Sequence, residues 1–342
     1  MNKKNLLVLT LVLVMLASFT VACSNQGGEE PTETTDSTEA TDSTETTDIN
    51  WPNKTIEIIV PFKPGGDSDY NARTLGKYLE IELGTSVVVS NVDGSGGSIG
   101  TRQARDATPD GYTLLSNHSS FIINKANDMI DFGFEEFELV GLYASNPGDV
   151  IAVSSDSGIT SLKDLEEVAN ANPGQTTIAT NIGATTQVSS FMLADSGIDL
   201  KQVDVGGITD KVAALMGGHV DVILGPYGNI KPYIDSGDMV AIGVTAQERA
   251  EGYPDIPTCI EQGYEAYFPT RFFLAFPKGT DQAIVEKMEN AVEKIVTMNE
   301  DYAKDIFEAY YEIPIFMPKN EALEEFNKID ELVNRYSLTS LE

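Results

Sequence analysis

The 342-residue sequence is poor in the residues that build metal centres, disulfides and catalytic triads. It contains two cysteines, Cys23 and Cys259, in unrelated contexts, and two histidines, His118 and His219. No spacing of cysteine and histidine matches a zinc site, and we expect no disulfide between Cys23 and Cys259. We therefore predict no metal site, no catalytic residues and no cofactor.

Positive charge is also scarce. Lysine and arginine number 22 against 53 aspartates and glutamates, which gives a formal net charge of -31. A field of this sign repels polyanions and excludes nucleic acid as a partner. It also repels small anions at long range, although salt screens that repulsion beyond about 10 Å. Any site for an anion must then be local, made of backbone N–H groups and helix dipoles.

The first 50 residues have the pattern of an export and anchoring segment. Residues 1–22 combine a basic start with an apolar run at 6–16, which is short for a membrane span and typical of a signal peptide. The residues before Cys23 resemble a lipoprotein processing site, so we predict that Cys23 is lipidated; plain secretion is the alternative. Residues 23–50 are acidic, rich in threonine and almost free of apolar side chains, which predicts a disordered tether.

From about Trp51 onward, strand and helix patterns alternate, which predicts an α/β fold with a largely parallel sheet covered by helices. The expected strands are 56–60, 86–90, 112–116, 150–154, 176–180, 220–224, 240–244 and 271–276. The expected helices are 69–83, 98–106, 161–171, 184–195, 208–217, 281–297, 300–310 and 320–336. The turn residues at 145–149 and a return near 245–255 predict two crossings between lobes. The predicted lobes are 51–148 with 250–342, and 149–249, hinged around a ligand cleft.

The most informative stretch is 56–73. A β-branched strand runs into a turn rich in proline and glycine, and a helix follows, for which Asp67, Ser68 and Asp69 are the expected N-cap residues. Such a turn leaves backbone N–H groups and the positive end of a helix dipole open at the end of a strand, which suits an anion. A plain tight turn is the alternative reading.

Several other loops have the same character. They are Asn91 to Gly100, Ser116-Asn117-His118-Ser119-Ser120, Thr180 to Gln187, and Gly206-Gly207-Ile208. The glycines at 94, 96 and 100 miss the spacing of a dinucleotide-binding loop by one residue. If these loops face the 56–73 loop across a cleft, two carboxylates of one ligand would each meet the start of a helix.

A set of motifs in a fixed order carries a family resemblance. They are Trp51-Pro52-Asn53-Lys54-Thr55-Ile56, Ile59-Val60-Pro61-Phe62-Lys63-Pro64-Gly65-Gly66, Gly94-Ser95-Gly96-Gly97, Pro109-Asp110-Gly111-Tyr112-Thr113-Leu114-Leu115, Leu215-Met216-Gly217-Gly218-His219-Val220-Asp221 and Pro254-Asp255-Ile256-Pro257-Thr258. Through them, residues 51–342 resemble the extracytoplasmic solute receptors of tripartite tricarboxylate transporters. The resemblance implies a type II periplasmic-binding-protein fold, in which two α/β lobes close on a small carboxylate.

The resemblance also implies the site and the partners. The first-strand loop would hold one carboxylate, partly through ordered water, with Phe62, Pro64, Gly65, Gly66, Ser68 and Asp69. The rest of the ligand would meet Ser116, Asn117, Gly183, Ala184, Thr185, Thr186 and Gln187. Asp67 and the helix start at Gly206 and Gly207 complete the predicted set. The partners implied are the large and small membrane subunits of the transporter, with this chain a monomer anchored by lipid at the outer face of the cell membrane.

Two departures from the family pattern concern the ligand. Asp67 stands where a third glycine is usual, and its carboxylate, if it points inward, would repel an anion or pair with an amino group. The stretch ending at Gly206 usually carries a lysine, which is lost here. Both changes lower the positive charge near the cleft, and they favour a mono- or dicarboxylate or an amino acid over a tricarboxylate.

Two other classes of function remain open. The same cleft would serve a receptor for a sensor kinase, which the sequence does not separate from a transport receptor. An enzyme such as a hydrolase would need a nucleophile with a basic partner, and neither a G-x-S-x-G elbow nor a partnered histidine is present. We therefore expect a binding protein and not an enzyme.

Overall fold

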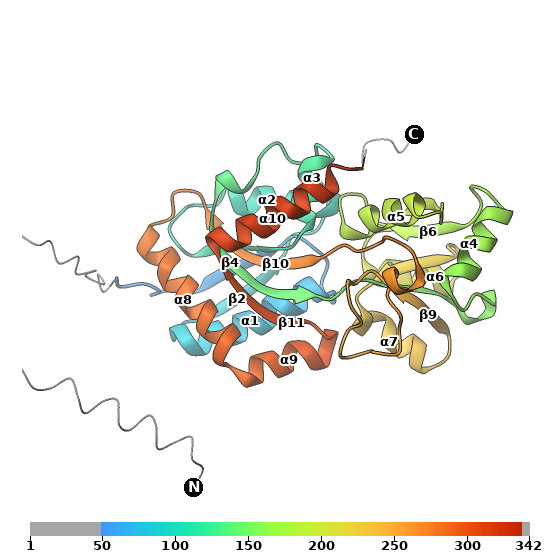
Figure 1. The fold of residues 1–342 in the computed structure, drawn as a ribbon. Helices are drawn as coiled ribbons and strands as arrows, with labels where there is room; N and C mark the ends of the chain where they lie inside the picture. Colours follow the sequence, from blue (N-terminus) through green and yellow to red (C-terminus); the bar gives the residue numbers. More distant parts are fainter. Residues whose placement is uncertain (1–48, 337–342) are drawn as a thin grey trace, which may run out of the picture. The chain divides into compact units, whose positions relative to one another are not determined.

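The computed structural model describes residues 49–336. The predicted signal peptide, Cys23 and nearly all of the tether lie outside the described residues. The described part belongs to a single compact unit, in which ten α-helices and eleven strands alternate along the chain (Figure 1). The predicted α/β class is confirmed. Between residues 49 and 336, no helix combines the length and the apolar character needed to cross a bilayer.

The strands form two sheets. Sheet A has the order β11-β4-β10-β3-β1-β2 and sheet B the order β7-β6-β8-β5-β9. The strands of sheet A are β1 (Ile56–Val60), β2 (Val87–Asn91), β3 (Thr113–Asn117), β4 (Phe137–Asn146), β10 (Thr270–Pro277) and β11 (Ile313–Pro318). The strands of sheet B are β5 (Val150–Ser154), β6 (Thr177–Thr180), β7 (Lys201–Asp204), β8 (Val222–Gly225) and β9 (Met239–Val244).

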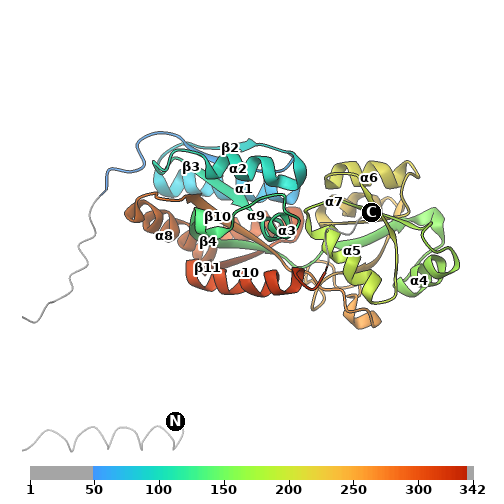
Figure 2. The ribbon, with the colours of Figure 1, turned by 90° about the horizontal axis from the view of Figure 1, so that it is seen from above.

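The helices divide between the two sheets, as Figures 1 and 2 show. Those around sheet A are α1 (Asp67–Leu83), α2 (Ser98–Arg105), α3 (Ser120–Ala126), α8 (Gln282–Met298), α9 (Glu300–Tyr310) and α10 (Lys319–Val333). Those around sheet B are α4 (Leu162–Ala171), α5 (Thr185–Asp195), α6 (Ile208–Met216) and α7 (Tyr227–Asp235). The chain passes from sheet A to sheet B at 147–149 and returns through 245–269.

The prediction of a largely parallel sheet is wrong. Four of the strand pairings are parallel and five are antiparallel. β4 carries the chain out of sheet A and β10 brings it back, so these neighbours run in opposite directions. β5 and β9 enter and leave sheet B and are antiparallel for the same reason. The crossings that make two sheets from one chain therefore impose the antiparallel pairings.

Five elements were not predicted from the sequence: β4, β7, β11, α3 and α7. Nine of the ten residues of β4 are buried, so the strand lacks the alternation of apolar and polar residues that reveals a half-buried strand. α7 contains Pro232 in its interior, which argues against a helix when only the sequence is read.

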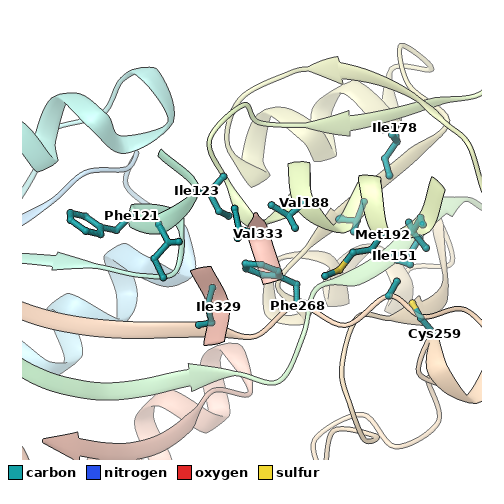
Figure 3. Close-up of a cluster of buried hydrophobic side chains, with 14 of the residues drawn as sticks. Phe121, Ile123, Ile151, Ile178, Val188, Met192, Cys259, Phe268, Ile329 and Val333 are labelled. Carbon is teal, nitrogen blue, oxygen red and sulfur yellow. The ribbon is translucent and has the colours of Figure 1, made fainter. Parts of the chain in front are cut away.

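Apolar packing also links the two halves. One buried cluster includes residues from both sheets and from the helices between them. Figure 3 shows Ile123 of α3, Val188 of α5, Val333 of α10 and Phe268 of the returning segment within this cluster. The two sheets are thus joined by side-chain packing as well as by the chain crossings.

Phe273 of β10 provides a test of the core. Its side chain is fully buried, and its ring packs edge-on against Phe121, Phe134 and Phe326 at centroid distances of 5.8, 5.2 and 5.3 Å. We expect Phe273→Ala to lower the free energy of unfolding by about 3–5 kcal/mol, because it leaves a cavity and removes aromatic contacts.

Denaturant unfolding measures this loss. Met298→Ala, at a side chain that is 77% exposed, is the control and should change the free energy by less than about 0.5 kcal/mol. Equal effects of the two substitutions would contradict the assignment of Phe273 to the core.

Candidate functional site

A cavity of about 120 Å³ lies where elements of both sheets meet. The loop after β1 and the start of α1 contribute one part of its wall. The starts of α5 and α6, the end of β8 and the first crossing segment contribute the rest. Ten of the residues predicted for the site line this cavity: Phe62, Pro64, Gly66, Asp67, Ser68, Ala184, Thr185, Thr186, Gly206 and Gly207. The structure thus brings loops together that lie up to about 140 residues apart in the sequence.

Six residues of the predicted set are not in the cavity wall: Gly65, Asp69, Ser116, Asn117, Gly183 and Gln187. The Gly65 carbonyl accepts a hydrogen bond from the Tyr310 hydroxyl at 3.0 Å. Asp69 accepts from the Gly65 N–H at 3.1 Å and from Arg73 at 2.9 Å. Burial alone would raise the pKa of Asp69, but Arg73, Asn91 and the Gly65 N–H together hold it below its usual value. These contacts fix the loop that carries the lining residues.

The other four residues also make contacts within the protein. The Ser116 hydroxyl lies 2.8 Å from the Tyr143 hydroxyl, and the Asn117 amide donates to Thr101 Oγ1 at 3.0 Å. Gln187 Oε1 accepts from the Gly183 N–H at 2.9 Å, which shapes the turn before α5. A direct role of these residues in binding a ligand stays a prediction.

The sequence analysis missed twelve residues of the wall: Lys63, His118, Asp149, Asn181, Ile208, Thr209, Asp210, Lys211, Leu224, Gly225, Pro226 and Thr270. Some of them lie in or next to segments that the sequence had already indicated as loops, crossings or helix starts. His118 is inside the predicted loop at 116–120, and Asp149 is inside the predicted crossing. Lys211 follows the Gly206-Gly207 helix start by one turn. By contrast, no pattern in the sequence indicated that the end of β8 or the start of β10 would belong to a site.

Lys211 supplies a positive charge at the cavity, where the sequence had indicated that positive charge is low. Its side chain is 4% exposed, and its Nζ donates to Thr186 Oγ1 at 2.8 Å. Burial lowers the pKa of Lys211 to about 8, although Asp149, Asp204 and Asp67 oppose this shift. The lysine usual in the stretch ending at Gly206 is absent, as the sequence shows, but Lys211 of α6 brings a positive charge to the cavity wall one turn later.

Acidic side chains share the cavity with this lysine. Asp67 is partly buried and accepts a hydrogen bond from the Ser68 N–H at 2.7 Å. Burial, together with the charge of Asp149, raises the pKa of Asp67 to about 6. Asp149 is 6% exposed and accepts from Thr185 Oγ1 at 3.2 Å. Burial raises the pKa of Asp149, against the influence of Lys211 and Thr185. The sequence left open whether Asp67 points into the cleft, and the structure places Asp67 in the cavity wall.

A third carboxyl group lies close to these two. Glu312 has no exposed surface, and neither of its carboxyl oxygens has a hydrogen-bond partner among the described residues. Burial raises its pKa well above the usual range, and the charges of Asp67 and Asp149 add to the shift. The amide of Asn71 is near enough to favour the charged form slightly, but it does not reach hydrogen-bond geometry.

Four helices begin at the cavity, α1, α5, α6 and α7, and their charges differ. The N-cap of α1 is Gly66 and not the predicted Asp67, Ser68 or Asp69, because Gly66 is the last residue with extended backbone. Asp67 and Asp69 instead occupy the first turn of α1 and compensate its dipole. The first turn of α6 contains Asp210, which pairs with Lys63 at 2.9 Å. The first turns of α5 and α7 have neither an acidic residue nor a side-chain cap, and the Asp149 carboxylate accepts from Thr185 Oγ1 at the start of α5.

Two rings form a flat part of the wall. Phe62 and His118 are stacked with a centroid distance of 4.7 Å and an interplanar angle of 18°. Burial lowers the pKa of His118 to about 3, so the imidazole is neutral at physiological pH. Its Nδ1 accepts a hydrogen bond from the Ser120 N–H at 3.2 Å. A histidine in this state is a poor general base and serves as an aromatic surface.

Loops on the two sides of the cavity also contact each other. The Asn124 amide of α3 donates to the Gly96 carbonyl at 3.0 Å and to the Gly183 carbonyl at 2.8 Å, so it links the loop after β2 with the loop before α5. Gly96 has φ +60°, and a Cβ atom at this position would clash with the backbone oxygen of Ile182. The absence of a side chain at Gly96 is therefore needed for this close approach.

The raised pKa of Asp67 makes a prediction about stability. Because the folded-state pKa lies above the ordinary value of 3.8, the charged form destabilises the unliganded fold. Stabilisation by the neutral form is complete below pH 4 and is lost as the pH rises through about 6. At pH 7.5, Asp67→Asn should raise the free energy of unfolding by about 1–2 kcal/mol, after allowance for partial exposure.

Denaturant unfolding between pH 4.5 and 7.5 checks this expectation. The advantage of the variant should shrink as the pH falls below 6. Asp199→Asn, at an exposed position before β7, is the control and should show no such trend. An advantage for Asp67→Asn that is absent at pH 7.5, or the same at all pH values, would contradict the environment described for Asp67.

Comparison with known proteins agrees with this architecture. Residues 71–336 match the family described as "Tripartite tricarboxylate transporter family receptor". Protein BugT of Bordetella pertussis is 30% identical over 242 residues, which are 69% of this chain and 74% of the relative. The structure of periplasmic binding protein BugD is 27% identical with a TM-score of 0.74, covering 84% of this chain and 96% of that chain. An R. palustris protein solved with adipate has a TM-score of 0.76 at 20% identity, over 85% of this chain and 97% of that chain, and shows the fold alone. The predicted type II periplasmic-binding-protein fold is confirmed, and the chain belongs to the receptor family of the tripartite tricarboxylate transporters.

Proposed function

We propose that this protein captures a small carboxylate in the cavity and delivers it to the large and small membrane subunits of a tripartite tricarboxylate-type transporter. One observation carries the proposal: the buried ammonium of Lys211 meets, at Thr186, the start of α5, whose first turn has no acidic residue and no side-chain cap. Both groups attract a carboxylate, and each acts only over a short range in this acidic protein.

The size of these attractions fits a solute receptor. A helix start contributes about 0.3–1 kcal/mol, and up to about 2 when it is partly buried. Each hydrogen bond to a charged group contributes about 1.5–3 kcal/mol. A few such contacts, offset by the cost of association, give binding near the micromolar range, which corresponds to about 8 kcal/mol.

The proposed mechanism is closure of two lobes on the ligand. The lobes are 51–148 with 250–342, and 149–249, and they would move about the crossings at 147–149 and 245–269. Contacts of Asn124 with loops on both sides of the cavity, and the Lys63–Asp210 ion pair, support a closed state that the ligand favours.

The proposed location is outside the cytoplasm, at the outer face of the cell membrane. This part of the proposal rests on the sequence: residues 1–22 would direct export, and Cys23 would carry the lipid. Residues 23–50 would then form a tether between the lipid and a monomeric receptor. Delivery would require that the receptor meets its membrane partner while it remains anchored.

Ligand binding is tested by thermal unfolding with succinate, malate, glutarate, propionate and L-aspartate, followed by calorimetry. A true ligand at 100 times its Kd should stabilise the protein by about 2.7 kcal/mol, which raises the Tm by several degrees. Lys211→Met keeps the apolar stem but removes the charge, and it should weaken carboxylate binding at least tenfold. Lys163→Met, at an exposed lysine of α4, is the control with unchanged binding. The absence of any shift with all five acids would contradict the proposed function.

Closure is tested at Gly96. A methyl group there would clash with the Ile182 backbone, so Gly96→Ala should favour an open form with a larger radius of gyration in small-angle scattering and a ligand affinity at least tenfold weaker. Gly84→Ala is a matched control, because Gly84 has φ +65° but nothing within 4 Å of an added Cβ. Equal effects of the two substitutions would assign the change to backbone strain and would contradict the closure contact.

A further inference from the structure

We propose that the ligand carries an amino group as well as a carboxylate, and that Asp67 and Asp149 bind its ammonium. This inference rests on the carboxylate-binding function proposed above and specifies the class of ligand: a small zwitterionic amino acid.

The charge balance in and behind the cavity favours a ligand with an ammonium group. The charge of Asp149 disfavours the charged form of Asp67, and the charges of Asp67 and Asp149 disfavour that of Glu312. Lys211 is buried among them, but its Nζ donates to the Thr186 hydroxyl and not to a carboxylate. Lys63 is engaged by Asp210. A ligand with only negative charges would add to this excess, whereas an ammonium group would offset it.

The second argument is the unused hydrogen-bonding capacity of Asp149. Its side chain is 6% exposed and lines the cavity. Thr185 donates to Oδ2, while Oδ1 accepts no hydrogen bond from the described residues. Within the described part of the chain, Oδ1 is not one of the fully buried atoms that lack a partner, so it remains open to a donor from a ligand in the cavity that Asp149 lines. An ammonium group has three N–H donors, which suits Oδ1 of Asp149 together with the carboxylate of Asp67.

The third argument is the state of the helix starts. Asp67 and Asp69 already compensate α1, and Asp210 already compensates α6. The starts of α5 and α7, which also lie at the cavity wall, have no acidic residue in the first turn. Of these two, the start of α5 has a buried ammonium beside it, because Lys211 Nζ donates to Thr186 Oγ1. The place for a carboxylate is therefore at α5 and Lys211.

The size of the cavity limits the side chain of this amino acid. About 120 Å³ corresponds to roughly four water molecules at about 30 Å³ each. The stacked rings of Phe62 and His118 offer a flat apolar surface to a short carbon chain.

The alternative is that Asp67 and Asp149 hold protons and that an anion binds beside them. The two readings differ in the effect of pH. If an ammonium binds to Asp67, protons compete with it, and the affinity for an amino acid falls between pH 7.5 and 5.5. If an anion binds beside neutral carboxyls, its affinity rises over the same range. The charged and titratable groups that face Asp67 or the cavity are Asp149, Lys211, Glu312, Asp210, Lys63, Tyr143, Tyr310 and His118.

Calorimetry with matched pairs of ligands tests the proposal on the full-length protein. The pairs are L-alanine and propionate, L-aspartate and succinate, and γ-aminobutyrate and butyrate. We expect the amine-bearing member of at least one pair to bind at least tenfold tighter than its partner at pH 7.5, and less tightly at pH 5.5. Tighter binding of the deaminated acids, with a rise at low pH, would overturn this inference and leave the proposed function intact. Failure of all six compounds to bind would overturn this inference, and malate and glutarate in the thermal-unfolding panel would then decide the proposed function.

Substitutions then assign the preference to residues. Asp67→Asn should reduce the preference for the amine at least tenfold, while the affinity for the deaminated acid stays the same or rises. Asp149→Asn should also reduce the preference for the amine. If the Asp149 variant does not fold, the test rests on Asp67→Asn, because Asp67 is only partly buried. Asp204→Asn removes a negative charge near Lys211 outside the cavity wall, and it should keep the preference. A preference that survives Asp67→Asn, or is lost equally in Asp204→Asn, would overturn the assignment.

Discussion

The antiparallel pairing of β4 with β10 is the constraint on which the cavity depends. The ladder runs from Thr270 opposite Asn146 to Pro277 opposite Phe137, and nearly all of it is buried. Asp149 follows the end of β4 by three residues, and Thr270 begins β10, so the ladder fixes two residues of the cavity wall. The crossing segments are therefore held by a sheet and not by loops alone, which is what a preorganised binding site needs.

The chemistry of the cavity follows from how few charges in it are paired. Most lysines and arginines of this chain form exposed ion pairs, which contribute little to stability. Lys211 differs because it is buried and reaches a hydroxyl, and Asp149 differs because half of its carboxylate has no donor. Backbone N–H groups remain part of the attraction at the starts of α5 and α7, whose first turns have no acidic residue. Attraction for the ligand is thus concentrated in a small part of a strongly acidic protein.

The sequence predicted what depends on local patterns. The strand at 56–60, the helices now seen as α1 and α8, and ten residues of the cavity wall follow from β-branched runs, helical periodicity, glycine-rich turns and the family motifs. β4 was missed because burial on both faces removes its periodicity. Lys211 and Asp149 were missed because their partners, Thr186 and Thr185, lie 25 and 36 residues away, and contacts at that distance leave no local signal.

The place of β10 in sheet A also sets the order in which the protein can mature. β3 and β4 are consecutive in the chain, yet β10 lies between them and pairs with both. A nascent chain that ends before Thr270 leaves those two strands with unsatisfied edges, which favour self-association. Sheet A is completed only after all of sheet B has been synthesised. A truncation that removes β10 would therefore destabilise β3 and β4 as well, although Thr270 lies more than 100 positions after the end of β4.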